Sequence, residues 1–200
     1  MNAAHPVVAG LILAAAAFGC SPPKQAGPLT PDAVVLAFGD SLTQGTGALP
    51  EESYTAVLEK LLGRRVINAG LGGEVSAAGL ARLPELLDQH RPALVILCHG
   101  GNDLLQKRDP AQIEEDLRTM IRLIRARGAD VLLVGVPRPG LVLKTAPFYG
   151  RLAREFDLPY EGAVLKTILS SGPLKSDAIH PNRAGYRRLA EGLALRIRTR

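Results

Sequence analysis

A serine, a histidine and an aspartate are spaced along this chain in a way that suits nucleophilic chemistry. Ser41 ends the segment Phe38-Gly39-Asp40-Ser41, which follows the apolar run 33–37. Such a pattern is typical of a buried strand that stops at a tight turn and exposes one hydroxyl. Asp177 and His180 are separated by two residues and are followed by Pro181, which is disfavoured inside a helix. A nucleophilic serine needs a base, and the base needs an orienting carboxylate, so these three side chains are candidates for those roles.

Three further groups are candidates for binding the oxyanion that acyl transfer creates. Gly73 allows the backbone to approach a ligand closely. Asn102, in the segment Gly100-Gly101-Asn102-Asp103, has a side-chain amide that donates hydrogen bonds, and the backbone N–H of Ser41 completes the set. Each residue alone is equally typical of a turn or a helix cap, so it is the combination that favours a site.

Neighbouring polar residues are given structural roles. Asp40 is predicted to bond backbone amides around the serine turn, and Asp103 is a better helix cap than Asn102. His99 ends an apolar run close to the candidate site and is expected to act on it indirectly at best. Cys98, inside that apolar run, is predicted to be buried and inert.

The elements that must position these residues alternate between short apolar runs and longer amphipathic ones. Strands are predicted over 34–38, 65–69, 94–98 and 131–136, and helices over 53–62, 76–89, 110–127, 148–156 and 182–198. The strands are continuously apolar, as expected when helices cover both faces of a parallel sheet. The alternation predicts a three-layer α/β/α sandwich around a central parallel sheet of about five strands.

In such a sheet, ligands bind outside the carboxyl ends of the strands. Ser41 follows the first apolar run, Gly73 follows the second and Asn102 follows the third. We therefore expect all three residues at one edge of the sheet.

Four segments of the chain, taken together, resemble the SGNH, or GDSL, hydrolase family. They are Gly39-Asp40-Ser41-Leu42, the glycine Gly73, Gly100-Gly101-Asn102-Asp103 and Asp177-Ala178-Ile179-His180-Pro181, in the family's order and spacing. The segment 68–90 is similar to that of the periplasmic thioesterase, lysophospholipase and arylesterase members of the family. The resemblance extends from about Val34 to Leu195.

The resemblance implies a flavodoxin-like fold and a serine esterase acting on small acyl esters or thioesters. It implies Ser41 as nucleophile, His180 as base and Asp177 as the partner of the base. It also implies an oxyanion hole made of the backbone N–H groups of Ser41 and Gly73 and the side chain of Asn102. No metal or organic cofactor is expected. The segment 138–149 is shorter than in the thioesterase members and Leu104-Leu105-Gln106 is more apolar, which leaves the acyl preference open.

Two other functions remain open from the sequence. The same residues serve carbohydrate acetylesterases of this family, and a noncatalytic binding module could retain the fold. An α/β-hydrolase is set aside, because its nucleophile turn requires Gly-x-Ser-x-Gly and no serine here is flanked in that way.

Composition argues against nucleic acid as a partner. The formal net charge is +5, from 24 Lys and Arg residues against 19 Asp and Glu residues, with much of the excess near the C-terminus. A nucleic-acid-binding face would combine such charge with aromatic side chains or a reading motif, and the chain has no Trp. A solvated face on a terminal helix is the better interpretation, with weak attraction to an anionic membrane surface left open.

The N-terminal segment predicts export. Residues 7–18 are nearly all apolar, which is too short for a transmembrane helix of ~20 residues but suits the core of a signal peptide. Ala17-Phe18-Gly19-Cys20 resembles a lipobox, although Phe18 is bulky and no Lys or Arg precedes the apolar stretch. We expect a signal peptide over 1–20 with Cys20 as a candidate membrane tether, a flexible linker over 21–31, a hydrolase domain over 32–200 and a periplasmic location.

Overall fold

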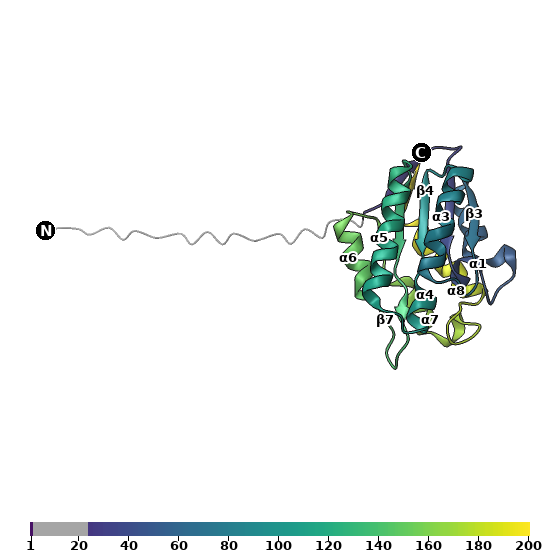
Figure 1. Ribbon diagram of the computed structural model, residues 1–200, viewed down its shortest axis with the longest axis vertical. Coiled ribbons are helices and arrows are strands. Elements are labelled where there is room, and N and C mark those ends of the chain that lie inside the picture. The colour runs from purple at the N-terminus through teal and green to yellow at the C-terminus, as the bar shows by residue number, and fades with distance from the viewer. Residues whose placement is uncertain (2–23) are drawn as a thin grey trace.

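Five parallel strands, in the order β3-β2-β4-β5-β8, make up the central sheet (Figure 1). The computed structural model describes residue 1 and residues 24–200. The strands are β2 (Val34–Gly39), β3 (Arg65–Gly70), β4 (Leu94–Cys98), β5 (Asp130–Val134) and β8 (Tyr160–Glu161). Every residue of β4 is buried, as its unbroken apolar sequence predicts for a central strand.

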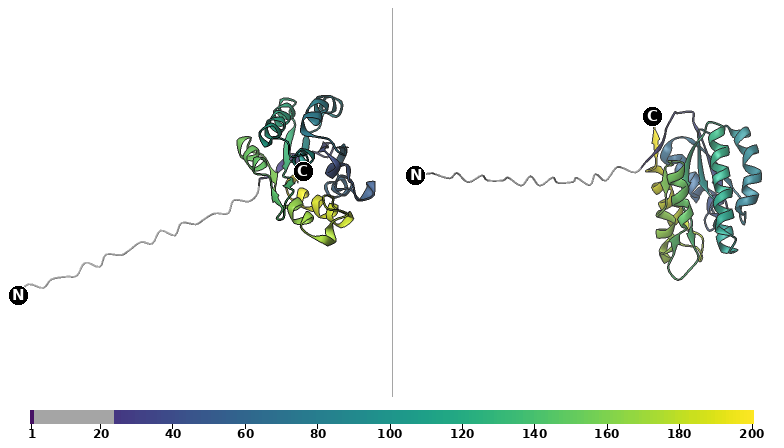
Figure 2. Two further views of the ribbon diagram at one scale, coloured as in Figure 1. Left: turned by 60° about the horizontal axis from the view of Figure 1, so that its bottom comes forward. Right: turned by 60° about the vertical axis from the view of Figure 1, so that its left-hand side comes forward.

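Helices cover both faces of this sheet. On one face α2 (Tyr54–Leu62) packs against α8 (Arg183–Ala194), and α7 (Val164–Leu169) lies beside α8. On the other face α5 (Pro110–Ala126) packs between α3 (Ser76–His90) and α6 (Pro147–Glu155) (Figure 2). The predicted three-layer α/β/α architecture with a five-stranded parallel sheet is therefore confirmed.

Four of the five predicted helices, α2, α3, α5 and α6, begin and end within one residue of their predicted bounds. In α5, the apolar residues at three- and four-residue spacing form the buried face: Ile113, Leu117, Met120, Ile121 and Ile124. Asp109 caps this helix, because its carboxylate accepts a hydrogen bond of 2.9 Å from the N–H of Ala111. Gly63 ends α2 in the left-handed conformation, with φ of 59°.

The two ends of the domain differ from the prediction. The last helix stops at Ala194 rather than reaching residue 198, and β9 (Ile197–Thr199) follows it. Part of the predicted flexible linker is a strand as well, because β1 (Ala26–Leu29) pairs in parallel with β9. Each segment is too short to show a period of its own, and pairing buries Ala26, Leu29 and Ile197.

Several short elements were also not predicted. They are β8, the helices α1 (Ser41–Gln44), α4 (Gly101–Leu105) and α7, and the antiparallel pair β6 (Pro137–Arg138) and β7 (Lys144–Thr145). The strand predicted over 131–136 ends at Val134, and the chain then continues into β6. Elements of two to six residues carry no readable hydrophobic period.

Apart from residue 1, the predicted signal peptide lies outside the described residues, and so does Cys20. Cys98 is buried and unpaired, as predicted. Within residues 24–200, no helix combines the length and the hydropathy that crossing a membrane requires.

Candidate active site

Three neighbouring strands, β3, β2 and β4, end together at one edge of the sheet. Gly39 of β2 lies between Gly70 of β3 and Cys98 of β4 in register. A side chain at Gly39 would place its Cβ 2.1 Å from the carbonyl oxygen of Cys98. Glycine is therefore required at the point where the chain leaves β2 and turns into α1, of which Ser41 is the first residue.

Ser41, His180 and Asp177 form a continuous chain of hydrogen bonds. The Oγ of Ser41 lies 3.0 Å from Nε2 of His180, and Nδ1 of His180 lies 2.8 Å from Oδ2 of Asp177. Oδ1 of Asp177 accepts from the backbone N–H groups of Ile179 and His180, each at 2.8 Å. The carboxylate thus holds both the ring and the turn that carries it. The ring in turn reaches Ser41, which is 139 positions away along the chain.

The charge of Asp177 is maintained by these contacts. Burial alone would raise the pKa of Asp177, but hydrogen bonds from His180 and from the two backbone N–H groups outweigh it and hold the pKa below its ordinary value. An ionised Asp177 accepts the proton on Nδ1 of His180, which leaves the lone pair of Nε2 facing the hydroxyl of Ser41.

The turn that carries His180 is fastened to the start of α8. Asn182 caps α8 by accepting from the N–H of Gly185 at 3.1 Å, and its amide donates to the carbonyl groups of Pro173 and Lys175. The N–H of Ser176 donates to the carbonyl oxygen of His180 at 3.0 Å. Hydrogen bonds therefore hold the turn that carries the His180 ring both before His180, at Ser176, and after it, at Asn182.

Asp40 has the structural role predicted for it. Its buried carboxylate accepts a hydrogen bond of 3.0 Å from the N–H of Leu42 at the start of α1. Burial raises the pKa of Asp40 above its ordinary value, while the N–H groups of Leu42 and Gly101 counteract that rise. Asp40 thereby ties the serine turn to the start of α4, which carries Asn102.

The loop that carries Gly73 meets the first turn of α4, which carries Asn102. Gly73 has φ of 78°, a left-handed conformation that suits glycine. The side-chain amide of Asn102 donates to the carbonyl oxygen of Glu74 at 2.9 Å, which links the loop to α4 directly. Among the described residues, no backbone acceptor is bonded to the N–H of Gly73.

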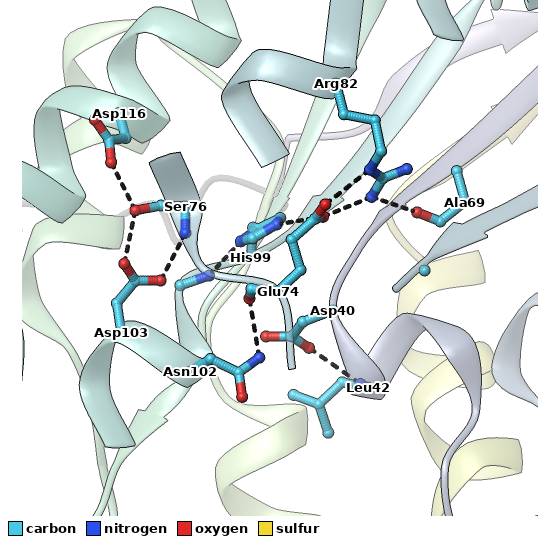
Figure 3. A network of polar contacts seen from close by, with 12 residues as sticks. Asp40, Leu42, Ala69, Glu74, Ser76, Arg82, His99, Asn102, Asp103 and Asp116 are labelled. Atoms are coloured by element: carbon cyan, nitrogen blue, oxygen red, sulfur yellow. Dashed lines mark hydrogen bonds and ion pairs between the residues drawn. The ribbon is translucent and has the colours of Figure 1, made fainter. Parts of the chain in front are cut away.

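A buried ionic cluster that the sequence analysis missed surrounds Glu74 (Figure 3). The Glu74 carboxylate accepts from Nε of Arg82 at 2.8 Å and from Nη2 of Arg82 at 2.6 Å. Nε2 of His99 lies 3.1 Å from the same carboxylate. Because the N–H of Gly100 donates to Nδ1 of His99 at 3.0 Å, the ring proton is on Nε2 and is donated to Glu74.

A second missed contact joins α3 to α4. The carboxylate of Asp103 accepts from the backbone N–H and from the hydroxyl of Ser76, both at 2.8 Å. Asp103 is a cap, as predicted, but it caps the neighbouring helix α3 rather than its own (Figure 3). Sequence gives no local signal for this pairing, because the two residues are 27 positions apart.

An apolar cavity of about 260 Å³ opens beside Ser41 and His180. Its walls come from α1, α4, α7, the β6–β7 connection and the His180 turn, and the principal apolar residues are Leu42, Leu105, Val136, Leu143, Leu169 and Ile179. Asn102 also lines it, so the cavity places apolar surface next to the polar groups described above.

A parallel α/β/α sheet with a hydrogen-bonded Ser-His-Asp set at its carboxyl edge is the architecture of a class of serine hydrolases. Residues 37–188 match the model of the GDSL-like lipase/acylhydrolase family. The chain therefore belongs to that family.

Known relatives are similar over most of the chain. Esterase TesA of Pseudomonas aeruginosa is 38% identical over 178 residues, which cover 80% of this chain and 85% of the relative. Thioesterase 1/protease 1/lysophospholipase L1 of Escherichia coli is 33% identical over 171 residues, covering 82% of each chain. The crystal structure of TesA superimposes with a TM-score of 0.71 at 34% identity and covers 80% of this chain and 95% of the other.

Proposed function

We propose that the protein is a serine esterase that hydrolyses acyl esters and thioesters through an acyl-enzyme on Ser41. The observation that carries this proposal is the unbroken hydrogen-bond chain from Ser41 through His180 to Asp177 at the wall of an apolar cavity. Membership of a lipase/acylhydrolase family supports the same reaction class.

In this mechanism His180 moves a proton twice. Nε2 of His180 takes the hydroxyl proton as Oγ of Ser41 attacks the acyl carbon, and Asp177 stabilises the imidazolium that forms. The imidazolium then gives its proton to the departing alcohol or thiol, and an acyl ester of Ser41 remains. Water attacks this ester with His180 again acting as base, which releases the acid and restores the hydroxyl.

The oxyanion of each tetrahedral intermediate would be bound by three donors. They are the backbone N–H groups of Ser41 and Gly73 and the second amide hydrogen of Asn102, whose first hydrogen is bonded to Glu74. Preorganised donors of this kind require no rearrangement at the moment when charge develops.

The apolar cavity supports an acyl group as the recognised part of the substrate. Its apolar walls would bury a hydrocarbon chain, at a gain of about 0.8 kcal/mol per buried CH₂. The relatives named as esterase and as thioesterase and lysophospholipase favour ester and thioester leaving groups for this chain as well.

Ser41→Ala tests the proposed function. The variant should fold normally, by circular dichroism and thermal unfolding, and should lose hydrolysis of p-nitrophenyl esters to the background rate. A folded variant that keeps its activity would contradict the proposal. Comparison of acetylated sugars with p-nitrophenyl esters of increasing chain length separates an acyl esterase from a carbohydrate acetylesterase.

We also propose that the protein is exported by a signal segment within residues 1–20, with cleavage before Cys20 so that Cys20 stays on the chain as a lipid anchor. The apolar stretch 7–18 and the position of the cysteine after it support this proposal. Metabolic labelling with palmitate should mark the wild-type chain and not Cys20→Ala. Equal labelling of both chains, or none of either, would contradict the anchor.

A further inference from the structure

Glu74 lies next to Gly73 in its loop and contacts Asn102 at the start of α4, so it touches both of the residues that carry proposed oxyanion donors besides Ser41. Its carbonyl oxygen accepts from the amide of Asn102, and its N-terminal neighbour is Gly73. Its carboxylate is held by Arg82 of α3 and by His99 at the end of β4. We propose that Glu74 is a positioning residue that keeps these donors in place. This assignment rests on the proposed function, under which Gly73 and Asn102 bind the oxyanion.

The contact with Asn102 decides which end of that amide faces the site. A carbonyl oxygen can bond only the NH₂ end of an amide side chain, so the amide oxygen is turned away from Glu74. The remaining amide hydrogen is then directed by the position of the Glu74 carbonyl. A displacement of about 1 Å in such a group can cost on the order of 100-fold in rate.

The groups that hold the carboxylate have little room to move. A Cβ at Gly79 would lie 2.4 Å from Nε2 of His99, so α3 packs directly against the ring. The guanidinium of Arg82 lies 4.5 Å from the centre of the Phe38 ring, and it donates at 3.1 Å to the carbonyl oxygen of Ala69. The carboxylate of Glu74 is therefore fixed to α3 through Arg82 and to the end of β4 through His99, and Arg82 in turn contacts β3 at Ala69 (Figure 3).

The test compares Glu74→Gln with Glu115→Gln, an exposed Glu of α5 that is also paired with an arginine. In Glu74→Gln, kcat for a p-nitrophenyl ester should fall on the order of 10- to 100-fold with KM within about twofold. Affinity for a trifluoromethyl ketone, which forms a tetrahedral oxyanion, should fall in parallel. Glu115→Gln should match the wild type in all three quantities.

Arg82→Gln is a second variant that tests the same role. The Arg82 side chain is partly exposed, and its removal leaves the contact between His99 and the Glu74 carboxylate in place. It should show the same kcat effect at smaller size. A folded Glu74→Gln or Arg82→Gln with wild-type kcat and inhibitor affinity would overturn the positioning role. Activity that survives in Ser41→Ala would instead overturn the proposed function, so the two failures are distinguishable.

A different feature, on the surface, carries a second inference. Exposed apolar side chains gather at the mouth of the cavity beside Ser41. Leu105 and Ile179 line the cavity and are exposed, and Leu141 and Val142 form the tip of the β6–β7 connection, with exposures of 109% and 72%. The residues on either side of that tip, Gly140 and Leu143, line the cavity as well. Clustered exposed apolar residues mark interaction sites, whereas single ones do not.

Basic residues stand close in sequence to the apolar residues of this mouth. Lys107 and Arg108 follow Leu105, and Arg138 and Lys144 flank the tip in β6 and β7. Among the described residues, none of the four forms an ion pair. The nearby acidic groups are already engaged, since Asp109 caps α5 and Asp177 is bonded to His180.

We infer that this mouth docks on an anionic lipid surface, with Leu141 and Val142 inserted among the acyl chains. Apolar side chains at the tip would enter the hydrocarbon boundary while the four basic residues contact anionic headgroups. The tip is continuous with the cavity, so an acyl chain could pass from the surface toward Ser41 without crossing water. Docking requires no catalytic step and is independent of the Ser41 mechanism.

A fluorescent probe on the tip tests the docking. In the full chain carrying Cys20→Ala, an NBD group is attached at Val142→Cys, and in a matched control at Leu61→Cys, an exposed apolar position on α2. Cys98 is buried and stays unlabelled. Vesicles of phosphatidylglycerol should shift the tip probe to the blue and raise its intensity severalfold, less so at high salt or with phosphatidylcholine.

The control probe should change little in any of these samples. No shift at the tip, or equal shifts at both positions, would overturn lipid docking. A tip shift that depends on protein concentration without vesicles would also overturn it, because it would assign the mouth to a second copy of the chain.

Discussion

His180 bonds both other members of the hydrogen-bonded set through its two ring nitrogens, at 3.0 Å to Ser41 and 2.8 Å to Asp177. The direction of proton transfer therefore depends on which nitrogen carries the proton. Asp177 decides this, because its ionised carboxylate can only accept.

Asp177→Asn should consequently lower kcat on the order of 10³- to 10⁴-fold, because an amide can donate to Nδ1 and favour the wrong tautomer. KM should change little and the fold should be kept. Steady-state kinetics on a p-nitrophenyl ester measures the effect. Asp88→Asn is the matched control, since Asp88 is an exposed aspartate near the C-terminal end of α3 that is paired with Arg127, and the change should leave kcat unchanged. A loss below about tenfold in Asp177→Asn would contradict the role.

Some residues of the site can be predicted from the sequence, and others cannot, for a physical reason. Ser41, Asp177 and His180 lie in short segments whose local pattern is informative. Glu74 and Arg82 meet only because α3 folds back over the loop before it, and an isolated Glu and Arg carry no motif. The adjacency of Glu74 to Gly73 was the one available signal.

At the scale of the elements, the turn between β2 and α1 depends on the absence of a side chain at Gly39. Gly39→Ala should destabilise the fold by about 1–3 kcal/mol, because its Cβ has no space against the carbonyl group of Cys98. It should also lower kcat, since Ser41 begins the helix that follows. Urea unfolding and ester hydrolysis measure the two effects. Gly172→Ala, at a position with nothing within 4 Å of the added Cβ, should show neither.

The pairing of β1 with β9 is a second feature of the elements that can be tested. Ile197→Ala should lower the free energy of unfolding by about 2 kcal/mol or more, because Ile197 is buried between the paired strand and the core. Leu195→Ala, two residues earlier but exposed, should change it by less than about 0.5 kcal/mol. Equal effects in urea unfolding would contradict a structured C-terminal strand.

These elements also show how far prediction from sequence reaches. The strand 94–98 and the start of α5 were predicted to the residue, because long apolar or amphipathic runs are dictated by burial in the sheet and helix layers. β1, β8 and β9 have two to four residues each and exist only through their partners. Their formation depends on tertiary pairing, which no local period records.

At the scale of the whole molecule, the ionic cluster around Glu74 links stability to pH. Burial alone would raise the pKa of Glu74, but hydrogen bonds from His99 and Arg82 lower it to about 2, against about 4.3 in an unfolded chain. A carboxylate whose pKa falls on folding stabilises the fold above its unfolded pKa. That stabilisation is lost as the pH falls through the folded pKa.

The difference in free energy of unfolding between the wild type and Glu74→Gln should therefore be constant above about pH 5 and shrink between about pH 4 and pH 2. Urea unfolding at stepped pH measures it. Glu115→Gln should give a smaller difference from the wild type at neutral pH. A Glu74→Gln difference as large at pH 3 as at pH 6 would contradict a depressed pKa for Glu74.

The fold, the polar edge of the sheet and the apolar cavity together support one central claim, an acyl-enzyme on Ser41. Intact-protein mass spectrometry with an active-site-directed phosphonate tests it most directly. We expect one adduct per chain, mapped to Ser41 by peptide analysis, absent from Ser41→Ala and much slower to form in His180→Ala. An unlabelled Ser41, or an adduct on another residue in a chain that still hydrolyses esters, would contradict it.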